Sequence, residues 1–297
     1  MSDETFDDSV PFLRRDGLVA GLSRRQLQGK RFRSASRGVI VPSAMRNDLR
    51  TRCTAMALVL PDGAVFSHHT AAALYRAPIA ADSNLHVSLV SSVEPRIDGV
   101  TAHRVQEVGP VRRVDGQSVT SPGRTFVDLA GRLDLPSLVA VGDSLLREPD
   151  AATTFRDALA NGVKRRGIRL ARTAFPLLNP RADSAPESHL RLLLTLAGYP
   201  PDFVNEPLFD EDGCKWAQPD NHYAVGLSLE YEGDHHRVDG RQWERDIRRD
   251  NRYRDRDWHL IKVTSSLLYQ RQPELVAEVA RILKRRGWHP HLTPLAS

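Results

Sequence analysis

The chain has 297 residues, of which 40% are hydrophobic, so it is long and apolar enough to form two domains with cores of their own. Its two cysteines, Cys53 and Cys214, are too far apart in sequence to indicate a disulfide framework or a four-cysteine zinc site. The N-terminus is acidic and no apolar segment approaches about 18 residues, so we expect a cytoplasmic protein with neither a secretion signal nor a membrane partner.

The net charge of +5 is carried mainly by arginine, a side chain that pairs well with phosphate. Because 42 basic residues are nearly balanced by 37 acidic ones, the charge alone leaves two interpretations open. The protein binds nucleic acid, or it has an ordinary mixed-charge surface. The pattern along the chain has to decide between them.

Residues 1–43 predict a small winged-helix-like DNA-binding unit. Two short helices and a hairpin are expected over residues 11–20, 24–28 and 32–41, with Ser23 as the N-cap of the second helix. This is the element order of a winged helix. The arginines that would face phosphate are Arg24, Arg25, Arg33 and Arg37. The alternative is a charged helical hairpin that docks on the next region, since the helices are short.

Residues 44–180 predict a mixed α/β middle region that serves as scaffold. Strands are expected over residues 85–89 and 100–105, and helices after Ser67, Ser121 and Pro136. His68 and His69 follow the expected cap Ser67, and no carboxylate or cysteine stands near them at ligand spacing. We therefore expect structural roles for these two histidines and no zinc site.

Residues 181–297 predict a helix followed by a mixed sheet with further helices. The order is a helix beginning near Ser184, two or three strands, a helix over about 242–254, a strand over 260–263 and a last helix over 273–286. Ser184 and Glu187 have the spacing of a capping box, which would give Glu187 a structural duty.

A strand that ends near residue 232 is the chemically densest part of this region. Apolar residues from Val225 to Tyr231 alternate with small or acidic ones, so one face should be buried and Glu230 and Glu232 should share the other. Two carboxylates on one strand face can bind a divalent cation if a third oxygen ligand converges on them. The alternative is the solvated face of an edge strand.

Residues 184–288 resemble the restriction-endonuclease-like fold, whose motif is an aspartate, a spacer and Glu-x-Lys. The closest resemblance is to the branch of unknown function related to very-short-patch mismatch-repair endonucleases. The matching residues are Glu230-Tyr231-Glu232-Gly233, His236, Asp246, Arg249 and Trp258. The N-terminal region resembles the winged-helix domain of AbiEi-type antitoxins through residues 21–25 and 37–41, and this combination is familiar from actinobacterial proteins.

The resemblance implies a Mg²⁺- or Mn²⁺-dependent DNA endonuclease with an α+β (mixed α/β) fold. It makes Asp220 and Glu230 metal ligands, and it puts Glu232, a further ligand, where the family usually has lysine. The other implied roles belong to His236 as general acid or base, Glu187 as a group that orients water, and Arg245 and Arg249 as phosphate contacts.

Two alternatives to the endonuclease stay open at this stage. In the first, the protein is a non-catalytic DNA-binding regulator of antitoxin type with a degenerate nuclease fold, because Glu232 cannot supply the positive charge of a lysine. In the second, it is an interaction scaffold without affinity for nucleic acid. The sequence leaves the oligomeric state and the choice between DNA and RNA undecided.

Overall fold

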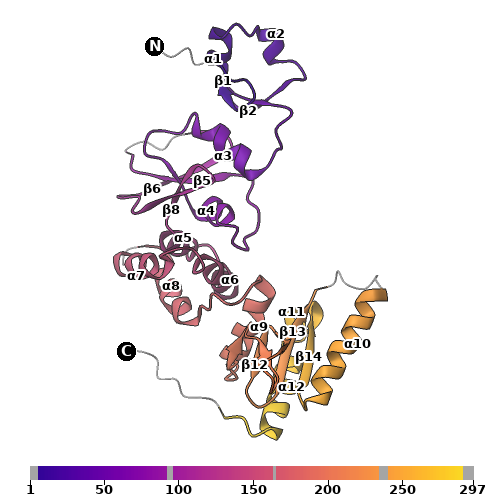
Figure 1. The fold of residues 1–297 in the computed structure, drawn as a ribbon. Helices are drawn as coiled ribbons and strands as arrows, with labels where there is room; N and C mark the ends of the chain where they lie inside the picture. The colour runs from indigo at the N-terminus through magenta and orange to yellow at the C-terminus, as the bar shows by residue number, and fades with distance from the viewer. Residues whose placement is uncertain (1–5, 92–95, 163–164, 234–239, 290–297) are drawn as a thin grey trace. The chain divides into compact units, whose positions relative to one another are not determined.

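The computed structural model describes residues 6–91, 96–162, 165–233 and 240–289, with the backbone alone over 240–247. In these residues the protein is a mixed α/β chain with twelve α-helices and several sheets (Figure 1). None of the described helices is both long and apolar enough to cross a membrane.

Contacts divide the chain into two compact units. Unit 1 comprises Met1–Arg132 and Glu148–Ile168, and unit 2 comprises Leu133–Arg147 and Arg169–Ser297. The sequence indicates a different division, into residues 1–43, 44–180 and 181–297, and that division stays a prediction.

Unit 1 begins with a small three-stranded sheet in the order β1-β3-β2. Its elements are β1 (Phe12–Leu13), α1 (Arg14–Val19), α2 (Arg24–Leu27), β2 (Phe32–Ser36) and β3 (Val39–Pro42). The predicted cap is confirmed, since the Ser23 hydroxyl accepts the Gln26 N–H and the Gln26 side chain accepts the Ser23 N–H. The predicted helix over residues 11–20 starts too early, because Phe12 pairs with Ile40 and is buried against Phe32.

The larger sheet of unit 1 has five strands in the order β6-β5-β4-β8-β7. The strands are β4 (Val65–Phe66), β5 (Leu85–Leu89), β6 (Val100–Arg104), β7 (Val111–Val114) and β8 (Gln117–Thr120). The helices of this part are α3 (Leu49–Ala57), α4 (His68–Leu74), α5 (Pro122–Leu129) and α7 (Ala151–Asn161). The strands expected over 85–89 and 100–105 are confirmed as β5 and β6, which pair in parallel.

Unit 2 is built on a four-stranded mixed sheet in the order β14-β13-β12-β9. The sheet strands are β9 (Phe203–Val204), β12 (Asn221–Tyr223), β13 (Leu227–Glu232) and β14 (His259–Thr264), beside a separate pair β10 (Leu208–Phe209) and β11 (Lys215–Ala217). The helices are α6 (Leu135–Leu145), α8 (Ile168–Ala174), α9 (Ala185–Leu196), α10 (Gly240–Asp255), α11 (Ser265–Tyr269) and α12 (Gln272–Arg285), with a short 3-10 turn η1 (Phe175–Leu177). The helices and the strand predicted beyond residue 240 are therefore confirmed.

The two faces of this sheet differ in chemistry. Strands β9, β12 and β13 pair antiparallel, while β14 returns through α10 and pairs in parallel with β13. Leu227 and Leu229 are fully buried in a core shared with α9 and α12. The alternate residues of β13 face α10, because the Tyr253 hydroxyl donates to Glu230 over 2.9 Å. The predicted alternation of β13 is thus confirmed, and its polar face is covered by a helix.

A buried carboxylate joins α6 to α9 within unit 2. The Asp143 side chain accepts hydrogen bonds from Arg191 at 2.8 Å, from Ser188 at 2.7 Å and from the Asn179 backbone at 2.6 Å. Burial raises the pKa of Asp143, and the Arg191 guanidinium acts in the opposite direction. This network fixes the N-terminal half of α9, which carries Glu187.

Candidate functional site

Asp220 and Glu230 lie at the same level of the unit 2 sheet. Asn221 of β12 pairs with Leu229 of β13, so Asp220, one residue earlier, lies beside Glu230, one residue later. Asp220 is further fixed by the Tyr231 N–H, which donates to its Oδ2 over 2.6 Å. The hairpin thereby brings together the two carboxylates that the sequence predicted as metal ligands.

The charge of Asp220 is poorly compensated in this position. Burial raises the pKa of its carboxyl to about 7, and the negative charges of Glu187 and Glu230 act in the same direction. The Tyr231 N–H and the Arg249 guanidinium oppose this shift without cancelling it. A site that holds three acidic groups near one another and raises the pKa values of Asp220 and Glu230 would be stabilised by a bound cation.

Glu187 meets one half of the predicted capping box: the Ser184 hydroxyl accepts the Glu187 N–H at 3.3 Å, but the Glu187 side chain accepts from the residue before the N-cap. Its Oε1 accepts from the Ser184 hydroxyl at 2.7 Å, and its Oε2 accepts from the Asp183 N–H at 2.8 Å. The Asn205 amide donates to the same Oε2, also at 2.8 Å. Glu187 therefore contributes negative charge near Asp220 while its oxygens are occupied by hydrogen bonds.

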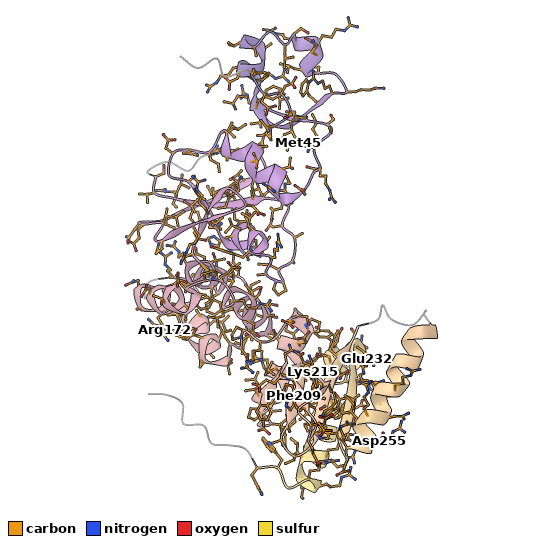
Figure 2. The ribbon with its side chains drawn as sticks, in the orientation of Figure 1. Met45, Arg172, Phe209, Lys215, Glu232 and Asp255 are labelled. Atoms are coloured by element: carbon orange, nitrogen blue, oxygen red, sulfur yellow. The ribbon has the colours of Figure 1, made fainter. Side chains whose placement is uncertain are left out.

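Arg249 of α10 links the two glutamates of β13. Its Nη1 lies 3.0 Å from Glu230 Oε2, and its Nη2 lies 3.7 Å from Glu232 Oε1. The Glu232 side chain is labelled in Figure 2. Burial raises the pKa of Glu230, while the Arg249 charge and the Tyr253 hydroxyl lower it. The two glutamates share one strand face, as predicted, and Arg249 is positioned against that face.

Lys262 supplies a positively charged side chain that sequence reasoning missed. It pairs with Glu230 in the parallel register of β13 and β14, and its Nζ lies 3.5 Å from Glu232 Oε1. The same Nζ lies 2.9 Å from Asp250 Oδ1. Burial lowers the pKa of Lys262, but the hydrogen bond and charge of Asp250, with Glu232, outweigh that effect and raise it. Lys262 thus holds positive charge beside Glu232 on the neighbouring strand.

The three predicted ligands do not converge into one compact group. Among the described residues, two sets of three His, Cys, Asp or Glu residues bring ligand atoms within 4.8 Å of one another, and both lie in unit 1. Glu232, at the end of β13, is held by Arg249 and Lys262 instead. The donor set that fits a hard divalent cation is therefore Asp220 with Glu230, both oxygen ligands.

The remaining predicted residues either lie outside the described part of the chain or belong to unit 1. His236 lies outside the described residues, as does the side chain of Arg245. In unit 1, Arg24, Arg25 and Arg37 are exposed, as a phosphate contact requires. Arg33 is half-buried and donates to the backbone carbonyls of Met45 and Arg46, both at 3.4 Å.

No family model matches the chain. It is 31% identical over 252 residues to the uncharacterized protein Rv2248 of Mycobacterium tuberculosis strain H37Rv, with 82% of this chain and 90% of that protein covered. The uncharacterized protein MT2308 of strain CDC 1551 matches with the same identity and coverage. The chain belongs to their family.

The breadth of the match to the Rv2248 family indicates that both units are part of the shared architecture, because neither unit alone is long enough to supply 252 aligned residues. The names of these relatives carry no activity. The chemistry of the site therefore has to be argued from its own residues.

A second cluster in unit 1 was also missed by sequence reasoning. His68 and His69 were expected to be structural, yet His86 of β5, His103 of β6 and Asp82 lie against them. The signal that could have indicated this cluster is the alternation of β5 and β6, which puts His86 and His103 on one face of two adjacent parallel strands. Local ligand spacing could not reveal residues that the sheet brings together.

Proposed function

We propose that unit 2 is a metal-dependent endonuclease domain that hydrolyses phosphodiester bonds in DNA. Asp220 and Glu230 hold a Mg²⁺ or Mn²⁺ ion, and Lys262 takes the part of the lysine that position 232 lacks. The observation that carries the proposal is the pair Asp220 and Glu230 on one hairpin, with the pKa of Asp220 raised to about 7 by burial and by neighbouring carboxylates.

The topology of unit 2 supports the proposal. Helix α9 is followed by the antiparallel strands β9, β12 and β13, then by α10 and the parallel strand β14. This is the order expected of a restriction-endonuclease-like domain from the resemblance of residues 184–288. Glu187, Asp220 and Glu230 come from the first helix and the central hairpin, which are the positions that the resemblance requires.

The roles of the side chains follow from their surroundings. A divalent cation bound here would act as a Lewis acid and lower the pKa of water. Asp220 and Glu230 bind it through oxygen, and their raised pKa values mean that the cation also stabilises their ionised forms. Lys262 and Arg249 hold positive charge at the edge of the pair, where a phosphate would gain most from it.

Two groups of arginines support DNA as the substrate. Arg249 and Arg245 lie on α10, the helix that covers the polar face of the sheet. In unit 1, Arg24 and Arg25 are exposed on α2, and Arg37 is exposed in the turn before β3. One guanidinium group can donate two parallel hydrogen bonds to a phosphate, and its charge neutralises that of the DNA backbone.

The test is cleavage of nicked, mismatched and single-stranded DNA with Mg²⁺ or Mn²⁺, with single-stranded RNA included to decide between the nucleic acids. The wild type should cleave at least one DNA substrate, and Glu230→Ala should be inactive. Glu274→Ala is a matched control, because Glu274 is an exposed glutamate on α12 paired with Arg271. The same products from the wild type and Glu230→Ala would overturn the proposal.

One observation favours a non-catalytic regulator as the second candidate. Glu230 is already neutralised by Arg249 at 3.0 Å and bonded to Tyr253 at 2.9 Å, an arrangement that a degenerate site could also keep. In that case calorimetry should detect no Mg²⁺ binding, while duplex DNA should still bind in a salt-sensitive way. Substituting Arg24 and Arg25 by alanine should then weaken binding and reduce the slope of log K against log salt by about 2.

A further inference from the structure

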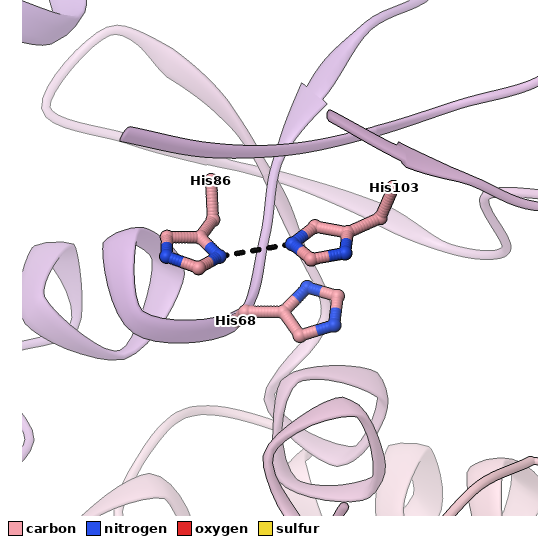
Figure 3. A group of neighbouring side chains, drawn as sticks. All are labelled: His68, His86 and His103. Carbon is pink, nitrogen blue, oxygen red and sulfur yellow. Dashed lines mark hydrogen bonds between the residues drawn. The ribbon is translucent and has the colours of Figure 1, made fainter. Parts of the chain in front are cut away.

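Three histidines of unit 1 point their rings toward one another (Figure 3). His68 is the first residue of α4, His86 belongs to β5 and His103 to β6. One ring nitrogen from each lies within 4.8 Å of the others. The parallel pairing of β5 with β6 places His86 opposite Thr101 and Ser88 opposite His103, so the two strand histidines are neighbours on one face.

The orientation of His86 is set by a carboxylate. Asp82 Oδ2 lies 3.0 Å from His86 Nε2, and on the other side of the ring His86 Nδ1 lies 2.9 Å from His103 Nε2. A carboxylate that accepts from Nε2–H leaves the lone pair of Nδ1 directed at the cluster. A carboxylate behind a histidine in this way is the usual outer partner of a metal-binding imidazole.

The rings of His68 and His103 lie among other basic groups. Burial lowers the pKa of His68 to about 2 and that of His103 to about 4, and neighbouring histidines and arginines add to both shifts. Neutral imidazole is the form that binds metal ions.

The backbone at His68 is strained. His68 has φ of 49°, in the left-handed region, and costs on the order of 1 kcal/mol there. Its neighbour Ser67, at the N-cap of α4, makes no side-chain cap and instead contacts His68 Nδ1 at 2.9 Å. The His68 ring stacks on His103, with centroids 3.7 Å apart and planes 23° from parallel, so it has to rotate away from this stack for both rings to bind one ion.

The cluster opens on one side to a cavity of about 760 Å³. His68 and His103 line it together with Arg104, Arg165 and Arg166. Three protein ligands with one position left to an open cavity is the arrangement of a zinc site that binds a further ligand. Glu107 and Asp128 also line the cavity, and Asp128 pairs with Arg165 over 3.4 Å, so it is the charge of Arg104 and Arg166 that favours an anionic ligand at that position.

We propose that His68, His86 and His103 bind one Zn²⁺ ion, with Asp82 as the outer partner of His86 and with the remaining position open to an anion in the cavity. A set of three nitrogen ligands selects zinc or a similar transition metal rather than Mg²⁺. This site lies in unit 1 and does not depend on the hydrolytic site of unit 2. The exposed Arg132 opposes it, since its charge lowers the pKa values of both His68 and His103 and would also repel a cation.

The experiment is a Zn²⁺ titration of the metal-free full chain, followed by calorimetry and checked with Co²⁺, whose visible absorption reports tetrahedral nitrogen ligation. The wild type should bind one equivalent of zinc at this site. His103→Gln should lower the affinity by more than about 100-fold, and Asp82→Asn by about 10- to 100-fold, the effect usual for an outer partner. Arg132→Gln should bind zinc more tightly than the wild type.

Control variants separate this site from other histidines. His259→Gln, which changes an exposed histidine of β14, should bind as the wild type does, and so should His235→Gln/His236→Gln. Circular dichroism should report the same fold for every variant compared. The absence of a zinc equivalent in the wild type, or an unchanged affinity in both His103→Gln and Asp82→Asn, would overturn the proposal.

Discussion

Replacing Asp220 by asparagine should stabilise the protein while abolishing its activity. Burial and nearby carboxylates raise the pKa of Asp220 from 3.8 to about 7 in the folded state. A difference of about 3 pKa units corresponds to about 4 kcal/mol at about 1.4 kcal/mol per unit, and this is an upper bound because the site relaxes. Asparagine keeps an oxygen acceptor for the Tyr231 N–H and carries no charge. We therefore expect Asp220→Asn to gain about 1–3 kcal/mol at pH 8.

The pH dependence of this gain has a defined sign. Since the folded pKa is raised, the protonated carboxyl favours folding below about pH 4, and this contribution is lost as the pH rises through about 7. The wild type and Asp220→Asn should thus be similar at pH 4, diverge between pH 4 and 7, and keep a constant difference above pH 7. Urea denaturation at each pH measures this difference.

Metal binding adds a second readout to the same variant. Mg²⁺ binds only the folded state, so it should raise the unfolding free energy of the wild type by about 2.7 kcal/mol at 100 times its dissociation constant and leave Asp220→Asn unchanged. Asp134→Asn is the control, because Asp134 is an exposed N-cap whose pKa is lowered by its hydrogen bonds with Ser137. If Asp220→Asn proves less stable than the wild type at pH 8, the electrostatic account of this site is refuted.

Three further predictions concern the cations and the buried network. Lys262→Met should lower the cleavage rate by about 100-fold or more, while Lys262→Arg should keep part of the activity. The control Lys284→Met, on α12, should cleave at the wild-type rate. A fully active Lys262→Met would show that the Lys262 charge takes no part in cleavage. Arg249→Ala should move the acid limb of the pH–rate profile to higher pH, because Arg249 lowers the pKa values of Asp220 and Glu230, whereas Arg281→Ala should leave the limb in place. Arg191→Met should destabilise unit 2 by about 3–5 kcal/mol in urea denaturation, because it leaves the Asp143 carboxylate buried without its cation. The control Arg169→Met, which changes an exposed arginine, should have little effect. A similar loss of stability in both variants would contradict this account.

Features set by local sequence were predictable. The capping of α9 by Ser184 follows from local sequence, and the structure confirms it, since the Ser184 hydroxyl accepts the Glu187 N–H. The alternation that buries Leu227 and Leu229 also depends only on the two-residue period of a strand. Such signals fix element type and face, which is why the helix α10 and the strand β14 were found within a few residues of their bounds.

Features that depend on strand pairing were not predictable. Lys262 is 30 residues beyond Glu232, and only the parallel register of β13 and β14 brings its Nζ to 3.5 Å from that glutamate. In the same way, His103 meets His68 through the pairing of two strands that the sequence indicated separately. Register across a long connection leaves no local pattern, so residues that converge by pairing have to be located in the structure.

The most direct test of the central claim is to measure the rate of DNA cleavage and the binding of Mn²⁺ on the same preparations. For the wild type, the cleavage rate should rise with Mn²⁺ and reach half its maximum near the dissociation constant found by calorimetry. Asp220→Asn should neither bind the ion at this site nor cleave, although it is the more stable protein. Cleavage that needs no metal, or cleavage by Asp220→Asn at the wild-type rate, would contradict the claim.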